Sequence, residues 1–458
     1  MPVSEQQMQK WCETLLAGHS AASDLSLSDY LRAIPGMASL ADVPSGTPVL
    51  VRGDVDAKPG ANIGEGDIRL RSMVDTLKFG QQRGWKQIIF GHIGRKPEGS
   101  LSKVAKRIGE LLKCEVALIS DWLDESTMTI PAAVAQQIAA AKPGAIIVLE
   151  NTRKYDIERV LWKAKQADLP NLAPKLAKLA NEFAKLSKIF VFEAFSAGSL
   201  DACSVAVPAA MEKVALGEYI AAEFTGPLMR CLDAQLVVFS GLKADKLDDM
   251  EAMISRGKIT RVITAGALSG ALRKAAGLLE GKNVSLGLAE DPAKKDQPYY
   301  VPDARIEQAR KMIAEGQQKG IKFILPVDFV IQDGSVVETL KPTDEQFDVG
   351  PKTLELFEKA IGEFLELDGA VAFYNGVFGM FEDPRFEGGT KRFIPQIKRM
   401  TDNGVEVYVG GGEGGAALEK YGEANWATHV FTAGGTVLNA LGIEPVPYLV
   451  ALRAAAKK

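Results

Sequence analysis

The amino-acid sequence predicts an α/β protein with two doubly wound, Rossmann-like parallel-sheet domains joined by a helical hinge. The chain has 458 residues, which is more than one hydrophobic core usually organises. Short apolar segments of strand type alternate with amphipathic helical segments along most of it, as in parallel sheets covered by helices on both faces. The residues that follow the strands differ between the two halves, so we expect a different ligand in each domain.

The composition excludes several classes of protein. Hydrophobic residues make up 47% and charged residues 24% of the chain, which is typical of a soluble globular protein. The net charge of −4 argues against nonspecific nucleic-acid binding. No apolar run reaches membrane-spanning length, and the N-terminus lacks the pattern of a signal peptide. The four cysteines form no CxxC pair, which excludes a zinc ribbon and suits a cytoplasmic protein.

Residues 1–45 are expected to form a helical extension. Met8, Trp11, Leu15 and Leu16 recur at helical spacing on one face. The segment 26–29 has the pattern of a helix N-cap. We interpret this extension as a packing element, because it carries no recognisable chemistry.

In the first half, cationic side chains follow the expected strands. These strands are 48–52, 87–90, 115–119, 145–149 and 189–192. Arg52, His92, Arg95 and Arg153 stand at strand ends, and Arg69 stands at the start of a long helix expected from residue 66. An isolated arginine is usually solvated surface, but these cations meet at one edge of a parallel sheet. Guanidinium groups bind carboxylates and phosphates bidentately, so an acidic substrate is expected there.

In the second half, glycine follows most of the expected strands. These strands are 235–239, 262–264, 322–325, 370–373, 404–409 and 428–431. Gly241, Gly266 and Gly376 follow three of them. Glycine at the carboxyl edge of a parallel sheet suits a nucleotide lying close to the backbone.

A glycine-rich stretch at 410–415 connects the strand 404–409 to a helix expected from residue 416. Glycines let the backbone approach a phosphate, and the free N–H groups of a helix N-terminus attract an anion. Gly410, Gly411 and Gly412 are therefore candidate phosphate-binding residues. The alternative is a tight turn of an α/β protein with no ligand.

These segments, taken in order, resemble the phosphoglycerate kinase family from about residue 49 to residue 452. Each is a weak signal alone, but their order is specific. The matching stretches are 51–54 (VRGD), 67–71 (DIRLR), 91–95 (GHIGR), 149–153 (LENTR), 241–243 (GLK), 326–328 (PVD), 348–351 (DVGP), 375–376 (NG), 379–382 (GMFE), 389–390 (GT) and the glycine-rich stretch.

The resemblance implies a glycolytic, hinge-closing kinase. Such an enzyme transfers a phosphoryl group between ATP or ADP and the carboxylate of 3-phosphoglycerate, which becomes 1,3-bisphosphoglycerate, with Mg²⁺ as cofactor. The expected segments are the extension 1–45, an acidic-substrate domain at 46–215, an interdomain helix at 216–233, a nucleotide domain at 234–440, and a tail at 441–458 that packs back on the first domain. We expect a monomer with no nucleic-acid or membrane partner.

The resemblance also implies roles for individual residues. Arg69 and Lys243 would be catalytic, beside the transferred group. The acidic substrate would be bound by Asp54, Asp56, Arg69, His92, Arg95 and Arg153. The nucleotide would be bound by Gly241, Lys243, Lys246, Gly266, Asn375, Glu382, Gly410, Gly411 and Gly412, and Glu413 would bind Mg²⁺. Phosphoryl transfer depends on positioning and charge neutralisation, and a carboxylate acceptor is already ionised at neutral pH.

The sequence departs from the family pattern at several of these positions. Asp56 stands where the family has asparagine, and is expected to repel the substrate. Ser199 and Leu200 stand near positions where the family has cations on the substrate phosphate, although Lys154 or Arg159 could fold into that gap. Losing such a partner could weaken binding by roughly 2–5 kcal/mol. Glu413 and Gly414 replace an aspartate and a hydroxyl-bearing residue.

Three functions remain open from the sequence. The first is a divergent phosphoglycerate kinase, favoured by the retained Arg69, Lys243 and Glu382. The second is a kinase of the same fold for a different carboxylic acid, favoured by Ser199 and Leu200. The third is a non-catalytic nucleotide-binding relative, favoured by Glu413 and Gly414.

Overall fold

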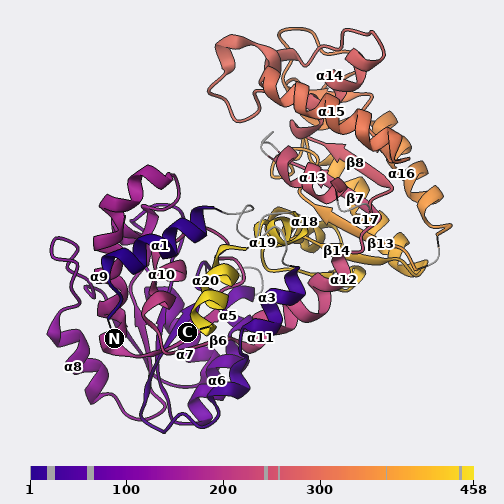
Figure 1. Cartoon of the computed structure of the whole chain (residues 1–458). Coiled ribbons are helices and arrows are strands. Elements are labelled where there is room, and N and C mark those ends of the chain that lie inside the picture. The colour runs from indigo at the N-terminus through magenta and orange to yellow at the C-terminus, as the bar shows by residue number, and fades with distance from the viewer. Residues whose placement is uncertain are drawn as a thin grey trace. The chain divides into compact units, whose positions relative to one another are not determined.

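The computed structural model describes residues 2–17, 26–58, 67–241, 246–255, 258–367, 369–442 and 446–457. The chain divides into two compact units (Figure 1), and each is described here by itself. Unit 1 comprises Met1–Gly226 and Glu444–Lys458, and unit 2 comprises Pro227–Ile443. Each unit contains one six-stranded parallel sheet. The predicted fold class, with two parallel-sheet α/β domains, is confirmed.

The sheet of unit 1 has the strand order β3-β4-β2-β1-β5-β6. Its strands are β1 Pro48–Gly53, β2 Lys86–Phe90, β3 Val116–Ile119, β4 Ile146–Leu149, β5 Ile189–Glu193 and β6 Lys213–Leu216. The central strand β1 is almost entirely buried, because helices cover both faces of a parallel sheet. The five predicted strands are present. β6 was not predicted, because it has only four residues and follows a stretch rich in alanine and proline.

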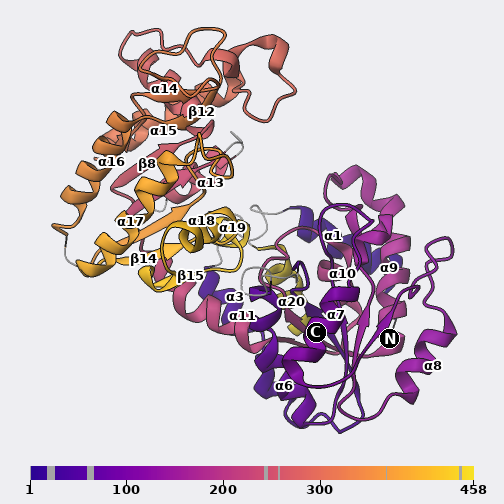
Figure 2. The ribbon, with the colours of Figure 1, turned by 180° about the vertical axis from the view of Figure 1, so that it is seen from behind.

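The helices of unit 1 surround this sheet (Figures 1 and 2). The α-helices are α1 Glu5–Leu16, α3 Leu27–Ala33, α5 Ile68–Ser72, α6 Val74–Gln82, α7 Ser102–Leu112, α8 Ala132–Ala140, α9 Leu169–Leu186, α10 Ala202–Val205, α11 Glu218–Glu223 and α20 Pro447–Ala456. Short 3-10 helices are η1 Met37–Leu40, η2 Thr152–Lys154, η3 Asp156–Arg159, η4 Gln166–Asp168 and η5 Val207–Ala210. The long helix predicted after residue 66 is interrupted at Met73, which separates α5 from α6.

The described part of the N-terminal extension contains the helices α1, α3 and η1, and α1 packs against α9. The predicted cap is also present, since the Ser26 side chain and Asp29 form a capping box at the start of α3. The tail helix α20, yellow in Figure 1, lies against α3 and β6 within unit 1. Its Tyr448 stacks on Phe192 of β5, with ring centroids 4.3 Å apart.

The segment predicted as one helix at 216–233 is helical but irregular. It consists of α11, a π-helical turn at Phe224–Leu228 and α12 Met229–Cys231. Pro227 lies inside the turn, and proline has no N–H to donate to the regular α-helical ladder. The division between the two units falls at this proline.

The sheet of unit 2 has the order β15-β14-β13-β7-β8-β9. Its strands are β7 Leu236–Ser240, β8 Arg261–Ala265, β9 Lys322–Ile324, β13 Val371–Asn375, β14 Glu406–Val409 and β15 His429–Val430. A separate antiparallel sheet of β10 Phe329–Ile331, β11 Val336–Val337 and β12 Gln346–Val349 was not predicted. Strands of two to four residues are too short to show a clear alternation of apolar and polar residues in the sequence.

The helices of unit 2 include the one expected after the glycine-rich stretch. The α-helices after α12 are α13 Lys246–Ser255, α14 Leu268–Leu279, α15 Asp303–Gln318, α16 Pro351–Phe364, α17 Gly388–Asp402, α18 Glu413–Tyr421 and α19 Gly434–Leu441. Short 3-10 helices are η7 Gly287–Glu290, η8 Pro292–Lys294 and η9 Ala424–Trp426. Among the residues that the structure describes, no helix is long and apolar enough to cross a membrane.

Candidate active site

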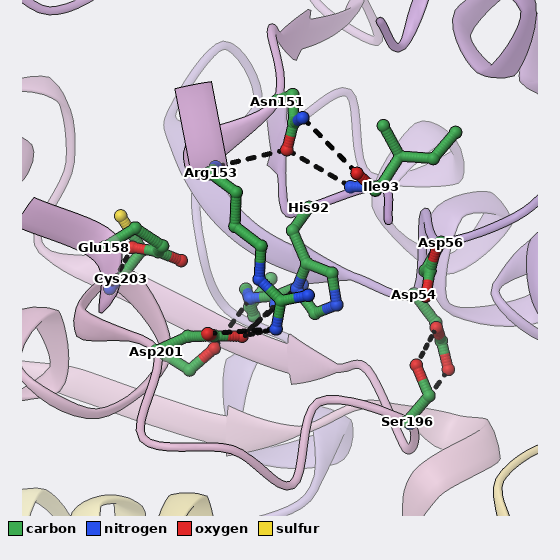
Figure 3. A network of polar contacts seen from close by, with 12 residues as sticks. Asp54, Asp56, His92, Ile93, Asn151, Arg153, Glu158, Ser196, Asp201 and Cys203 are labelled. Carbon is green, nitrogen blue, oxygen red and sulfur yellow. Dashed lines mark hydrogen bonds and ion pairs between the residues drawn. The ribbon is translucent and has the colours of Figure 1, made fainter. Parts of the chain in front are cut away.

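The predicted cations of unit 1 gather at the carboxyl edge of its sheet, as Figure 3 shows for His92 and Arg153. The strands β4, β2, β1 and β5 are neighbours, and Arg153, His92 and Arg52 come from the ends of the first three. All three side chains are buried. The structure therefore brings together cations that are far apart in the sequence.

A buried carboxylate, which was not predicted, lies at the centre of these cations. We define the Asp201 cluster as Asp201, Arg52, His92, Arg153 and Trp162. Nη2 of Arg153 donates to both carboxylate oxygens of Asp201 at 3.1 Å. Nε1 of Trp162 donates to Oδ1 at 2.9 Å. Nδ1 of His92 lies 3.1 Å from Oδ2, and Nη2 of Arg52 lies 3.7 Å from the same oxygen.

The negative charge of Asp201 is offset within the Asp201 cluster, which keeps an excess of positive charge. Burial opposes ionisation of Asp201, but the hydrogen bond with His92 and the charges of His92, Arg153 and Arg52 lower its pKa. Burial lowers the pKa of His92, against the opposing effect of Asp201. Because His92 loses its proton more readily than usual, the two guanidinium groups offset the charge of Asp201 at neutral pH and leave one positive charge over.

A second buried carboxyl group lies behind the Asp201 cluster. Oε2 of Glu158 accepts a hydrogen bond of 2.9 Å from the backbone N–H of Cys203. Burial, together with the charge of Asp201, raises the pKa of Glu158 to about 7. This carboxyl group therefore holds its proton more readily than an exposed one.

Arg69, the predicted catalytic arginine, lies between two aspartates. Its Nη1 donates to Oδ2 of Asp56 at 3.1 Å, and its Nε lies 4.0 Å from Oδ1 of Asp54. The Arg69 side chain remains 22% exposed. Asp56 also accepts from the backbone N–H of Gly94 at 2.8 Å. Asp56 therefore positions Arg69. The sequence had led us to expect only that Asp56 repels the substrate.

The other residues expected at this edge differ in burial and in their partners. Asp54 is buried and accepts from the N–H and hydroxyl of Ser196 at 3.0 and 2.5 Å (Figure 3). Arg95 is exposed. Lys154 and Arg159, considered as replacements for the absent cation, instead pair with Asp121 and Asp156.

The carboxyl edge of the sheet in unit 2 contains a cavity of about 370 Å³. The predicted residues Gly241, Gly266, Glu382 and Glu413 line it. Aromatic and aliphatic side chains also line it, among them Leu286, Phe347, Phe378 and Met380. An apolar cavity with a few polar groups at its rim suits a nucleoside.

Several glycines at this edge have no room for a side chain. A Cβ on Gly411 would lie 2.1 Å from the carbonyl oxygen of Phe431. Gly266 has a φ of +66°, and its Cβ would lie 2.7 Å from the carbonyl oxygen of Gly241. A Cβ on Gly410 would lie 2.9 Å from Oδ1 of Asn375, which brings that predicted residue beside the glycine-rich stretch. The sequence excess of glycine therefore has a packing cause.

Two helices begin at this edge directly after strands. α18 follows β14 and has Gly412 as its N-cap, with a φ of +72°, and α19 follows β15. The strand, turn and helix predicted at 404–420 are confirmed, and the helix begins at Glu413 rather than near 416. N–H groups at helix N-termini attract phosphate. The predicted Lys246 begins α13, and its Nζ donates to the carbonyl of Ser240 at 3.0 Å.

Other predicted and unpredicted residues complete the edge. The predicted catalytic Lys243 lies outside the described residues. Arg273 of α14 lines the cavity but was not predicted. Its guanidinium carbon lies 3.8 Å from the Phe329 ring centroid, and burial lowers its pKa to about 9. Its only signal in the sequence was its place, next to Lys274, in a helix of mostly small and apolar residues.

Glu413 is the residue expected to hold Mg²⁺. In the described part of the chain, no group of three or more His, Cys, Asp or Glu side chains is placed to hold a metal ion. Mg²⁺ usually takes one or two carboxylates and completes its shell with water and substrate phosphates. A single carboxylate at a helix N-terminus beside a cavity fits that ion.

Relatives found by sequence share one family name. A family model described as phosphoglycerate kinase matches residues 40–443. A phosphoglycerate kinase of Clostridium kluyveri is 30% identical over 431 residues, which cover 89% of this chain and 96% of the relative. A cytosolic phosphoglycerate kinase of Triticum aestivum is 28% identical over 405 residues, covering 84% and 90%.

Solved structures share the fold. The phosphoglycerate kinase of Pyrococcus horikoshii OT3 superposes with a TM-score of 0.72 at 23% identity, covering 93% of this chain and 100% of the other. The phosphoglycerate kinase of Coxiella burnetii gives a TM-score of 0.66 at 22% identity, covering 92% and 100%. At these identities the likeness concerns the fold alone.

Proposed function

The chain belongs to the phosphoglycerate kinase family, and on this premise we propose that it transfers a phosphoryl group between ATP or ADP and the carboxylate of a small acid. The family's own acid, 3-phosphoglycerate, is the first to test. The observation that carries the proposal is the combination of a cavity with glycine turns and helix N-termini at the sheet edge of unit 2.

The side chains at the edge of unit 1 suit a carboxylate acceptor. A carboxylate is ionised at neutral pH and needs no general base to attack phosphorus. Arg69 is held in place by Asp56 and keeps part of its surface exposed. It would stabilise the charge on the transferred group, which is the main requirement of phosphoryl transfer.

At the edge of unit 2, the backbone would bind the nucleotide. The N–H groups of Gly411 and Gly412 lie at the start of α18, where the helix dipole favours phosphate. Glu382 and Asn375 would contact the nucleoside, and Glu413 would hold Mg²⁺. When bound, Mg²⁺ neutralises negative charge on the nucleotide phosphates. Lys243 would neutralise the charge of the transferred phosphoryl group.

We also propose that the protein is a cytoplasmic monomer with no nucleic-acid or membrane partner.

The test measures ATP-dependent acyl-phosphate formation with Mg²⁺, coupled to reductive removal of the product. Both 3-phosphoglycerate and unphosphorylated glycerate are supplied as acids. Arg69→Ala and Lys243→Ala should each lower kcat by about 1,000-fold or more, the size of effect seen for cations on a transferred phosphoryl group. Arg71→Ala is the matched control on α5, because Arg71 pairs with Asp67 and is half exposed.

The outcomes separate the possible functions. Turnover that survives Arg71→Ala but is lost in both other variants supports the kinase. If the protein binds ADP but transfers phosphate to neither acid, the proposal fails and a non-catalytic nucleotide-binding role takes its place.

A further inference from the structure

The Asp201 cluster indicates which class of acid the site accepts. We propose that Asp201 is a specificity-determining residue: it acts as an internal counter-ion that disfavours a phosphate on the acid substrate and favours an acid with an uncharged tail. This proposal rests on the proposed function and narrows its substrate.

The contacts of Asp201 use the donors that would otherwise bind an external anion. Arg153 directs its Nη2 to both carboxylate oxygens, and its Nη1 to the carbonyl of Gly94 at 2.7 Å. Nε of Arg52 donates to the hydroxyl of Ser204 at 2.8 Å, and its Nη1 to the carbonyl of Gly53 at 2.7 Å. The ends of both guanidinium groups are therefore engaged within the chain. An external phosphate could take Nη2 of Arg153 only after Asp201 had left it.

Displacing Asp201 is unfavourable because the cluster is buried. Asp201 is fully buried, and Arg52 and Arg153 are 1% and 5% exposed. Trp162 also holds the carboxylate from its own side at 2.9 Å. A buried carboxylate separated from its cations loses several kcal/mol, since neither water nor another donor replaces them.

The charge of a phosphate adds to this obstacle. A phosphate monoester carries about 1.5 to 2 negative charges at pH 7, and it would approach the ionised Asp201 in a poorly solvated region. Where water is excluded, repulsion between the phosphate and the carboxylate of Asp201 reduces the attraction that Arg52 and Arg153 would otherwise exert on the phosphate. A hydroxyl or another neutral group meets no such repulsion.

The partly exposed groups at the same edge are sufficient for one carboxylate. Arg69 is 22% exposed and Asp56 31% exposed at the side chain, and Arg95 is exposed. One acid group can therefore meet cationic side chains here without entering the Asp201 cluster. A small hydroxy acid such as glycerate has this distribution of charge.

The experiment compares binding of glycerate and 3-phosphoglycerate by calorimetry in the full chain. The variants are Asp201→Asn, which keeps the shape and removes the charge, and the control Asp121→Asn, whose aspartate is 88% exposed and pairs with Lys154. We expect wild type to bind glycerate at least as tightly as 3-phosphoglycerate. Asp201→Asn should bind 3-phosphoglycerate at least about tenfold more tightly, with a change of less than about threefold for glycerate. Asp121→Asn should match wild type.

A kinetic measurement distinguishes selection from simple loss of structure. Where turnover is present, Asp201→Asn should lower KM for 3-phosphoglycerate relative to KM for glycerate, a selective change that a merely destabilised enzyme would not show. Should Asp201→Asn fail to fold, Asp201→Ser and the comparison of the two acids on wild type provide the same test.

Failure of this inference is separable from failure of the proposed function. A wild type that transfers phosphate but prefers 3-phosphoglycerate overturns the role of Asp201 alone, as does an Asp201→Asn variant with no gain in affinity. A chain that binds glycerate in preference but transfers phosphate to no acid overturns the kinase function and leaves the selectivity standing.

Discussion

The two sheet edges present different kinds of group to a ligand. The edge in unit 1 uses charged side chains, and the chain itself already supplies carboxylates to most of them. The edge in unit 2 uses backbone N–H groups, helix N-termini and a cavity of about 370 Å³. A single aspartate can therefore offset part of the positive charge of the first edge, whereas the second edge depends on backbone conformation and is less sensitive to one charge.

The same comparison applies to two buried aspartates. In unit 1, Asp201 faces guanidinium groups, and its pKa is lowered. In unit 2, the hydrogen bonds that Asp348 accepts from described residues come from the backbone N–H groups of Gly389 at 2.6 Å and Val349 at 2.8 Å. Burial raises the pKa of Asp348 to about 7. Burial favours a raised pKa in both carboxyl groups, so the presence or absence of nearby cations decides the direction of the pKa shift.

The largest effect is expected from breaking the Asp201 cluster. Arg153→Ala should lower the free energy of unfolding by about 3–5 kcal/mol, because it leaves a buried carboxylate short of a partner. The measurement is urea denaturation at neutral pH. Arg159→Ala is the control, since its surface pair with Asp156 contributes no more than about 1 kcal/mol. Equal losses in the two variants would show that the cluster is no more important than a surface pair.

The next effect concerns the glycine turn of unit 2. Gly411→Ala places a Cβ against the carbonyl of Phe431 and should weaken ADP binding by about 100-fold, which corresponds to about 2.7 kcal/mol. Binding of the acid should not change. In the neighbouring helix α19, a Cβ on Gly435 would meet nothing within 4 Å, so Gly435→Ala serves as the matched control. ADP binding is measured by calorimetry. If both variants bind ADP like wild type, the glycine turn does not bind the nucleotide phosphates.

The smallest expected effect is the pH dependence of stability that Asp348 causes, and it tests the comparison of the two buried aspartates. The pKa of Asp348 is raised from an ordinary value near 4, so the folded chain holds a proton that the unfolded chain releases. This contribution to stability is present below pH 4 and is lost as the pH rises towards 7, by at most about 1.4 kcal/mol per pH unit. Asp348→Asn should flatten this part of the curve of unfolding free energy against pH. An unchanged slope would show that Asp348 is not the responsible group.

Most of the fold could be predicted because its signals are local. The strands β1, β2, β4, β5 and β7 are short apolar runs ended by turn residues, a pattern that buried parallel strands require. The turn at Gly412 could be predicted for the same reason, since glycine alone adopts its backbone conformation freely. β6 and the strands β10 to β12 were missed, because their few residues carry little pattern.

The site was only partly predictable, because its charges depend on residues that are far apart in the sequence and meet in the folded chain. The cations Arg52, His92 and Arg153 were found from their positions after strands. Asp201 was missed, since nothing near it in the sequence shows that its carboxylate turns into the same cluster. Asp56 was expected to repel the substrate, and only the structure shows it holding Arg69.

The sequence by itself determined the alternation of strands and helices, the cationic first half, the glycine-rich second half and the family. These properties follow from local pattern and backbone preference. Only the tertiary structure decided which charges remain available, because side chains separated by 48 or more positions, such as Arg153 and Asp201, meet only after folding. Ionisation and hydrogen bonding depend on that meeting, and the acid that the site accepts depends on them in turn.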